Sequence, residues 1–106
     1  MEKKKIFVVR AHFWWDGAGE RDSYDEVLDS IWSTEEAAKR RIDDLANQYI
    51  RWEWYNQGCD IDDFECYTDW SEDRMQVKVR TDPYAENTYY VEEFEIDPEL
   101  PDFEGP

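Results

Sequence analysis

A single long helix, marked by a clear signal at each end, constrains the fold of this chain most strongly. The motif Ser33-Thr34-Glu35-Glu36 predicts a capping box, in which the Ser33 hydroxyl accepts a hydrogen bond from the amide three residues on. Gly58 supplies the left-handed residue that commonly ends a helix. The helix is therefore predicted over residues 34–57, a length of roughly 36 Å. Its core-facing stripe is predicted to be Ala38, Ile42, Leu45, Tyr49 and Trp52.

Segments typical of β-strands lie on both sides of this helix. Residues 6–13 are rich in β-branched and aromatic side chains, and a second strand is predicted over 24–32 after a turn at 16–19. Beyond Gly58, alternating apolar and polar residues predict three more strands, over 64–70, 75–80 and 88–96. The predicted order is ββαβββ, an α+β fold in which one long helix lies across an antiparallel sheet of about five strands.

The last two predicted strands can be aligned by their apolar residues. We predict a register that places Val77 opposite Phe94 and Lys78 opposite Glu93. The proline-rich C-terminus should be extended, so we expect a single domain over residues 1–97 and an acidic tail over 98–106. A chain of 106 residues is enough for one domain and too short for two with separate cores.

Charge is unevenly distributed along the chain. The net charge is -16, from 28 acidic residues against 12 Lys and Arg. Residues 1–58 hold 9 basic and 12 acidic side chains, a net of -3, whereas residues 59–106 hold 3 and 16, a net of -13. This acidity argues against direct binding to nucleic acid or to anionic membranes. Solubility alone does not require such segregation, so we predict a one-sided surface that meets a basic partner.

The acidic side chains of the second half fall into two groups. The first is Asp60, Asp62, Asp63, Glu65, Asp69, Glu72 and Asp73, and the second is Glu92, Glu93, Glu95, Asp97, Glu99, Asp102 and Glu104. Every second residue over 93–99 is acidic, and on a strand these carboxylates would project to one side about 6.6–6.8 Å apart. A row of this kind is expected to enter a basic groove built for nucleic acid. The alternative is a solvated edge strand whose acidity blocks edge pairing.

Aromatic residues, at 17% with six Trp, exceed the usual share for so short a chain. Trp14 and Trp15 are predicted at the tip of the first hairpin, and Trp54 and Tyr55 late in the helix. They can anchor an interface, cover a thin core, or join two copies through the helix end. The predicted partner-binding residues are Asp60, Asp62, Asp63, Glu92, Glu93, Glu95, Asp97, Glu99, Trp14, Trp15, Trp54 and Tyr55.

No motif in the chain carries a catalytic or metal-binding signature. Residues 60–63 begin like a calcium-binding loop, but Phe64 stands where an oxygen ligand belongs, so no metal or cofactor is expected. Paired carboxylates alone do not support a hydrolase, and His12 is the single histidine, so no enzymatic activity is expected. Cys59 and Cys66 match no metal or redox spacing. With no signal-peptide pattern at residues 1–5, we expect reduced thiols in a cytoplasmic protein.

The segment Lys5-Ile6-Phe7-Val8-Val9-Arg10-Ala11-His12, followed by Ser33-Thr34-Glu35-Glu36-Ala37-Ala38, resembles short uncharacterised proteins of phages and prophages. This resemblance covers residues 4–45 at most. In size and charge the whole chain is similar to phage-encoded nucleic-acid mimics, including anti-CRISPR proteins and anti-restriction inhibitors. The likeness implies an inhibitor of a host nucleic-acid-binding protein in the bacterial cytoplasm: a CRISPR effector, restriction enzyme, nucleoid protein or polymerase. The alternative is a non-inhibitory homodimeric structural or interaction protein whose acidity serves solubility.

Overall fold

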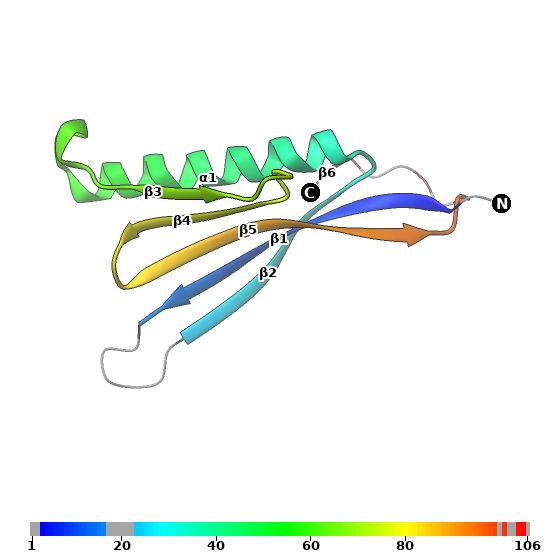
Figure 1. Ribbon diagram of the computed structural model, residues 1–106, viewed down its shortest axis with the longest axis horizontal. Helices are drawn as coiled ribbons and strands as arrows, with labels where there is room; N and C mark the ends of the chain where they lie inside the picture. The colour runs from blue at the N-terminus through cyan, green and yellow to red at the C-terminus, as the bar shows by residue number, and fades with distance from the viewer. Residues whose placement is uncertain (1–2, 17–22, 100, 102–103, 106) are drawn as a thin grey trace.

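The computed structural model describes residues 3–16, 23–99, 101 and 104–105 (Figure 1). In chain order, its elements are β1 (Lys4–Trp15), β2 (Ser23–Trp32), α1 (Glu35–Gln57), a short 3-10 helix (Ile61–Asp63), β3 (Tyr67–Trp70), β4 (Gln76–Asp82), β5 (Ala85–Ile96) and β6 (Glu104–Gly105). The predicted α+β fold and the order ββαβββ are confirmed. The two-residue strand β6, which falls in the predicted tail, pairs with the end of β2.

The sheet is antiparallel, with strand order β3-β4-β5-β1-β2-β6. β1 and β5 have 12 residues each and pair along their whole length, from Lys4 opposite Ile96 to Trp15 opposite Ala85. β3 forms one edge of the sheet. α1 packs against one face, chiefly over β4, β1 and β5, and no described helix covers the other face (Figure 1).

The core lies between α1 and the covered face of the sheet. Phe7, Val9 and Ala11 of β1 point toward α1 at the alternation of a strand, and Ile6 and Val8 between them are buried as well. The buried cluster consists of Phe7, Val9, Ala11, Ala38, Ile42, Ala46, Val77, Val79, Tyr89 and Val91. Neither α1 nor the 3-10 helix in the described part of the chain has the length and apolar character to cross a bilayer.

The prediction that Trp52 belongs to the core stripe of the helix is wrong. Ala38 and Ile42 are buried as predicted, but Trp52 is 61% exposed and Ala46 is buried instead. A helix turns by about 100° per residue, so Trp52 points about 120° away from the buried Ala46, whereas Ile50 points only about 40° away from it. Ile50 contributes to the core at this end of the helix.

The predicted N-cap is also wrong, by one residue. Thr34 caps α1: its backbone is extended, with φ -125° and ψ 147°, and its Oγ1 accepts a hydrogen bond from the Ala37 amide at 3.3 Å. Ser33 and Thr34 have the same capping chemistry, so the backbone path out of β2 decides between them. At the other end, Gly58 has φ 64° and ends the helix as predicted.

The predicted register between the last two strands is wrong by five residues. Val77 lies opposite Tyr89 and Lys78 opposite Thr88, because Pro83 and Tyr84 alone connect β4 to β5, with Asp82 opposite Ala85. An odd shift moves every β5 side chain to the other face of the sheet. Phe94, which the predicted register places opposite Val77, is therefore on the other face of the sheet and is 41% exposed. The strand predicted over 64–70 is also shorter, because the 3-10 helix precedes it and β3 begins only at Tyr67.

Candidate protein-interaction surface

The first acidic group follows one edge of the sheet, and we call it the acidic edge. It spans the connection after α1, the edge strand β3 and the turn before β4 (Figure 1). All of its side chains are exposed, and no Lys or Arg occurs between residues 59 and 73. Its members are Asp60, Asp62, Asp63, Glu65, Asp69, Glu72 and Asp73.

Local hydrogen bonds shape the first part of the acidic edge. The Asp63 amide donates to the Asp60 carbonyl at 2.9 Å, which closes the 3-10 turn. The indole Nε1 of Trp54 donates to the Cys59 carbonyl at 2.9 Å and ties this turn to the end of α1. Phe64 is half-buried, while the carboxylates around it remain in solvent. The apolar residue thus fixes the turn and the acidic residues face outward.

The other end of the acidic edge is a turn built on Asp73. Its Oδ1 accepts hydrogen bonds from the Met75 amide at 3.0 Å and from the Ser71 hydroxyl at 2.7 Å. The Met75 amide, followed by the Ser71 hydroxyl, lowers the pKa of the Asp73 carboxyl. Asp73 is therefore a fixed negative charge at neutral pH.

The two acidic groups predicted from the sequence differ in whether they form ion pairs among the described residues. Arg10 Nε lies 3.2 Å from Glu92 Oε1, and Lys5 Nζ lies 3.6 Å from Glu93 Oε1, both across the β1–β5 pair. Within the described residues, no ion pair involves a member of the acidic edge. The second group is thus partly neutralised within the chain, whereas no ion pair within the described residues neutralises the acidic edge.

The predicted row of carboxylates over residues 93–99 is not continuous. Glu93 and Glu95 lie on the same face of β5, but the strand ends at Ile96. Asp97 Oδ1 then accepts a hydrogen bond from the Glu99 amide at 2.9 Å, and the chain turns. The regular strand spacing predicted for this row is therefore limited to two side chains. Asp102 lies outside the described residues, as does the predicted turn over 17–19.

The 3-10 turn of the acidic edge and the end of β5 lie at opposite ends of the molecule, whereas the Asp73 turn lies beside β5, where the Val91 amide donates a hydrogen bond to the Met75 carbonyl at 2.8 Å. The molecule measures 53 × 32 × 24 Å. In Figure 1 the connection from α1 to β3 lies at one end of the long axis, and the end of β5 lies at the other. The structure therefore places Asp60, Asp62 and Asp63 on one surface and the predicted acids of residues 92–99 on another.

The predicted aromatic anchors also fall in two places. Trp14 and Trp15 end β1; the Arg80 guanidinium lies 6.0 Å from the Trp14 ring, and Trp15 is partly exposed. Trp54 and Tyr55 lie in the last turns of α1, close in sequence to the acidic edge. Of these four residues, Trp54 is the one bonded to the connection that carries the acidic edge.

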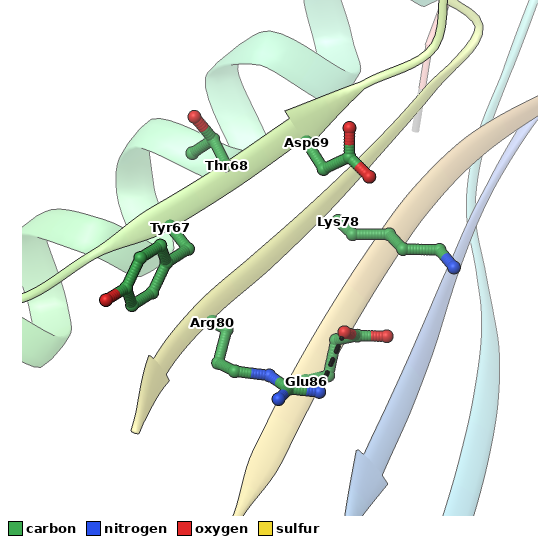
Figure 2. A pocket seen from close by; sticks show the side chains of 6 residues that line it. All are labelled: Tyr67, Thr68, Asp69, Lys78, Arg80 and Glu86. Atoms are coloured by element: carbon green, nitrogen blue, oxygen red, sulfur yellow. Dashed lines mark hydrogen bonds and ion pairs between the residues drawn. The ribbon is translucent and has the colours of Figure 1, made fainter. Parts of the chain in front are cut away.

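A hollow on the uncovered face of the sheet borders the acidic edge and is not predicted from the sequence (Figure 2). It has a volume of about 590 Å³ and is lined by Tyr67, Thr68, Asp69, Lys78, Arg80 and Glu86. Arg80 Nη2 lies 3.0 Å from Glu86 Oε2. The predicted register places Lys78 opposite Glu93, so that register does not bring Arg80 near Glu86. A tight turn at Pro83 and Tyr84, with Arg80 and Glu86 on either side of it, is the sequence pattern that could have predicted this pair. Tyr67, 69% exposed, becomes an accessible aromatic beside Asp69.

The site offers exposed carboxylates and exposed aromatic side chains. Among the residues described, no three His, Cys, Asp or Glu side chains gather as metal ligands would. Cys59 and Cys66 are free and half-buried, and burial raises the pKa of the Cys66 thiol, which keeps it protonated at neutral pH. A comparison of the chain with protein-family models, curated proteins and solved structures finds no match.

Proposed function

We propose that this protein is a non-enzymatic inhibitor that binds a basic, nucleic-acid-binding surface of another protein through its acidic edge. One observation carries the proposal: seven exposed carboxylates lie within residues 60–73 with no Lys or Arg between them and no ion pair to a described residue. Groups left unpaired in this way keep their full attraction for cations of a partner.

The mechanism is electrostatic and steric. Carboxylates along the edge take the positions that phosphates occupy on the partner, and the body of the domain then excludes nucleic acid. Complementary charge of this kind raises the association rate and makes it fall steeply with ionic strength. The segment 59–106, with its net charge of -13, supplies most of the field.

Exposed apolar side chains within the same edge supply the contact that charge alone cannot. Ile61 and Tyr67 are both largely exposed, and each stands among the carboxylates of the edge. Apolar and aromatic anchors at the centre of an interface carry much of the binding energy, while rim charges contribute less. Tyr67 is therefore the proposed specificity anchor.

The partner class follows from this chemistry. A protein that holds a phosphate backbone offers rows of Arg and Lys, which carboxylates can engage. In a phage setting, the partners that fit are a CRISPR effector, a restriction enzyme, a nucleoid protein or a polymerase of the host. The resemblance in charge and size to phage nucleic-acid mimics supports this class, and the experiment below identifies the member.

The test is an affinity capture from nuclease-treated bacterial lysate, with elution by a salt gradient and identification by mass spectrometry. Two variants each remove four negative charges from opposite ends of the molecule. The first, Asp60→Asn, Asp62→Asn, Asp63→Asn and Glu65→Gln, should lose a partner that nucleic acid competes away. The matched control, Glu93→Gln, Glu95→Gln, Asp97→Asn and Glu99→Gln, should retain it. Equal loss in both variants would assign the capture to net charge alone, and undiminished capture by the first would reject the acidic edge.

A further inference from the structure

The outward face of α1 carries a second, separate surface. Six residues of the helix point away from the sheet, and all are exposed: Arg40, Asp44, Asn47, Gln48, Arg51 and Tyr55. They recur at helical spacing on the side opposite Ala38 and Ile42.

This face is close to neutral in a strongly acidic protein. Its six residues include two Arg and one Asp, a net of +1, and the whole helix over residues 35–57 has a net charge of -1, whereas the remaining residues have a net charge of -15. Two copies that approach through α1 therefore meet with little net repulsion at the contact, unlike two copies that approach through the acidic edge.

The six outward residues are complementary to themselves in an antiparallel arrangement. A twofold axis between residues 47 and 48 pairs each residue i with residue 95 − i of a second helix. Asp44 then faces Arg51 of the other copy, and this ion pair occurs twice by symmetry. Arg40 faces Tyr55, where a guanidinium meets an aromatic ring, and Asn47 faces Gln48. None of these charged residues forms an ion pair with a described residue of its own chain.

The C-terminal end of this helix face also carries an exposed aromatic surface. Trp52 and Tyr55 are stacked, with ring centroids 6.4 Å apart and planes at 24°. Together with Gln48 and Arg51 they line a shallow hollow of about 390 Å³. Tyr55 is 77% exposed, which leaves the stack open. In the antiparallel arrangement, the aliphatic stem of Arg40 from the second copy lies over this stack, as long cationic side chains commonly do.

We propose that two copies of the chain associate through the outward face of α1, as an antiparallel helix pair in which Asp44 of each copy contacts Arg51 of the other. The surface extends about 22 Å from Arg40 to Tyr55, enough for a weak, reversible dimer. It is separate from the acidic edge, so the dimer and the proposed inhibition stand or fall independently. A dimer of this form presents two acidic edges to a partner.

Charge reversal at two positions tests the arrangement by sedimentation equilibrium over a range of protein concentrations. Asp44→Arg and Arg51→Asp, each alone, place like charges together twice and should weaken dimerisation about tenfold. An equimolar mixture of the two variants pairs arginine with aspartate at both contacts and should restore association as a heterodimer. The double variant in one chain should also restore it. Circular dichroism of each variant establishes that the exposed substitutions leave the fold intact.

Three outcomes would overturn the proposal. The unmodified protein remaining monomeric at every concentration would exclude the dimer. Single variants that associate as well as the unmodified protein would place any dimer on another surface. If the single variants dimerise weakly and neither the mixture nor the double variant restores dimerisation, the antiparallel register is excluded. In that register, exchanging the two charges must remove the repulsion between like charges.

Discussion

Arg41 of α1 holds Asp29 of β2 in a two-point ion pair: Nε lies 2.7 Å from Oδ2, and Nη2 lies 3.0 Å from Oδ1. Asp29 is the extra residue of a bulge, since Val9 pairs with Ser30 and Arg10 with Leu28. The bulge brings Asp29 into contact with the helix instead of leaving it in the regular alternation of β2. The pair thus joins α1 to the strand that precedes it.

Replacing Asp29 with Ala should lower the free energy of unfolding by about 1–3 kcal/mol, because a half-buried guanidinium would lose both of its hydrogen bonds. The Ser30 hydroxyl, which donates to Asp29 Oδ2 at 2.7 Å, would lose its acceptor as well. Urea denaturation measures the change. Asp25→Ala, on the same strand but in no described ion pair, is the matched control and should differ little from the unmodified protein. Equal unfolding midpoints for the two variants would show that the pair contributes no stability.

The same pair makes stability depend on pH. Hydrogen bonds from Arg41, ahead of the opposing effect of burial, hold the pKa of Asp29 below its ordinary value of 3.8. A depressed pKa stabilises the fold fully above the ordinary value, and this contribution is lost as the pH falls through the lower pKa of the folded state. The difference in unfolding free energy between the unmodified protein and Asp29→Asn should therefore be constant near neutral pH and shrink below about pH 4. A difference that stays constant to lower pH would contradict a depressed pKa.

The ends of the helix were predictable because neighbouring residues in the sequence determine them. The register of the sheet depends on contacts between residues far apart in the sequence. Gly58 ends α1 because a left-handed residue is needed there, and neighbouring residues alone reveal that need. β4 and β5 both alternate, so several registers match equally well from sequence. The two-residue turn at Pro83 and Tyr84, together with burial of Tyr89 under α1, selects one of them.

The sequence predicts which acidic residues could form the candidate site, but not which of them form ion pairs within the chain. The sequence locates every carboxylate, yet Lys5 and Arg10 reach Glu93 and Glu92 from the first strand, far away in the chain. That contact depends on β1 lying beside β5, which follows from strand order and not from any local pattern. Because these ion pairs partly neutralise the second acidic group, the acidic edge is the stronger candidate.

Ile42 and Trp52 separate the two sides of α1 and can be tested together. Ile42 is fully buried, so Ile42→Ala should destabilise the fold by about 2–5 kcal/mol through lost contacts and a residual cavity. Trp52→Ser removes a larger side chain from a largely exposed position, and the free energy of unfolding should change by about 0.5 kcal/mol or less. Thermal or urea unfolding at low protein concentration measures both. If Trp52→Ser lowered the free energy of unfolding more than Ile42→Ala, Trp52 would be shown to belong to the core.

Arg74 has a backbone conformation that favours glycine. Its φ is 63°, in the turn between β3 and β4, and its guanidinium lies 4.7 Å from the centroid of the Trp70 ring. Arg74→Ala keeps the strained backbone and loses the cation–π contact, which should destabilise the fold by about 0.5–1 kcal/mol.

Arg74→Gly loses the same contact but removes the steric cost of a left-handed residue, about 1–2 kcal/mol, at some cost in the entropy of the unfolded chain. The glycine variant should therefore be more stable than the alanine variant, and close to the unmodified protein. Paired urea denaturation curves of the two variants measure the difference directly. If the alanine variant proves equal to or more stable than the glycine variant, then the positive φ at this turn carries no strain, and Arg74 contributes only through its contact with Trp70.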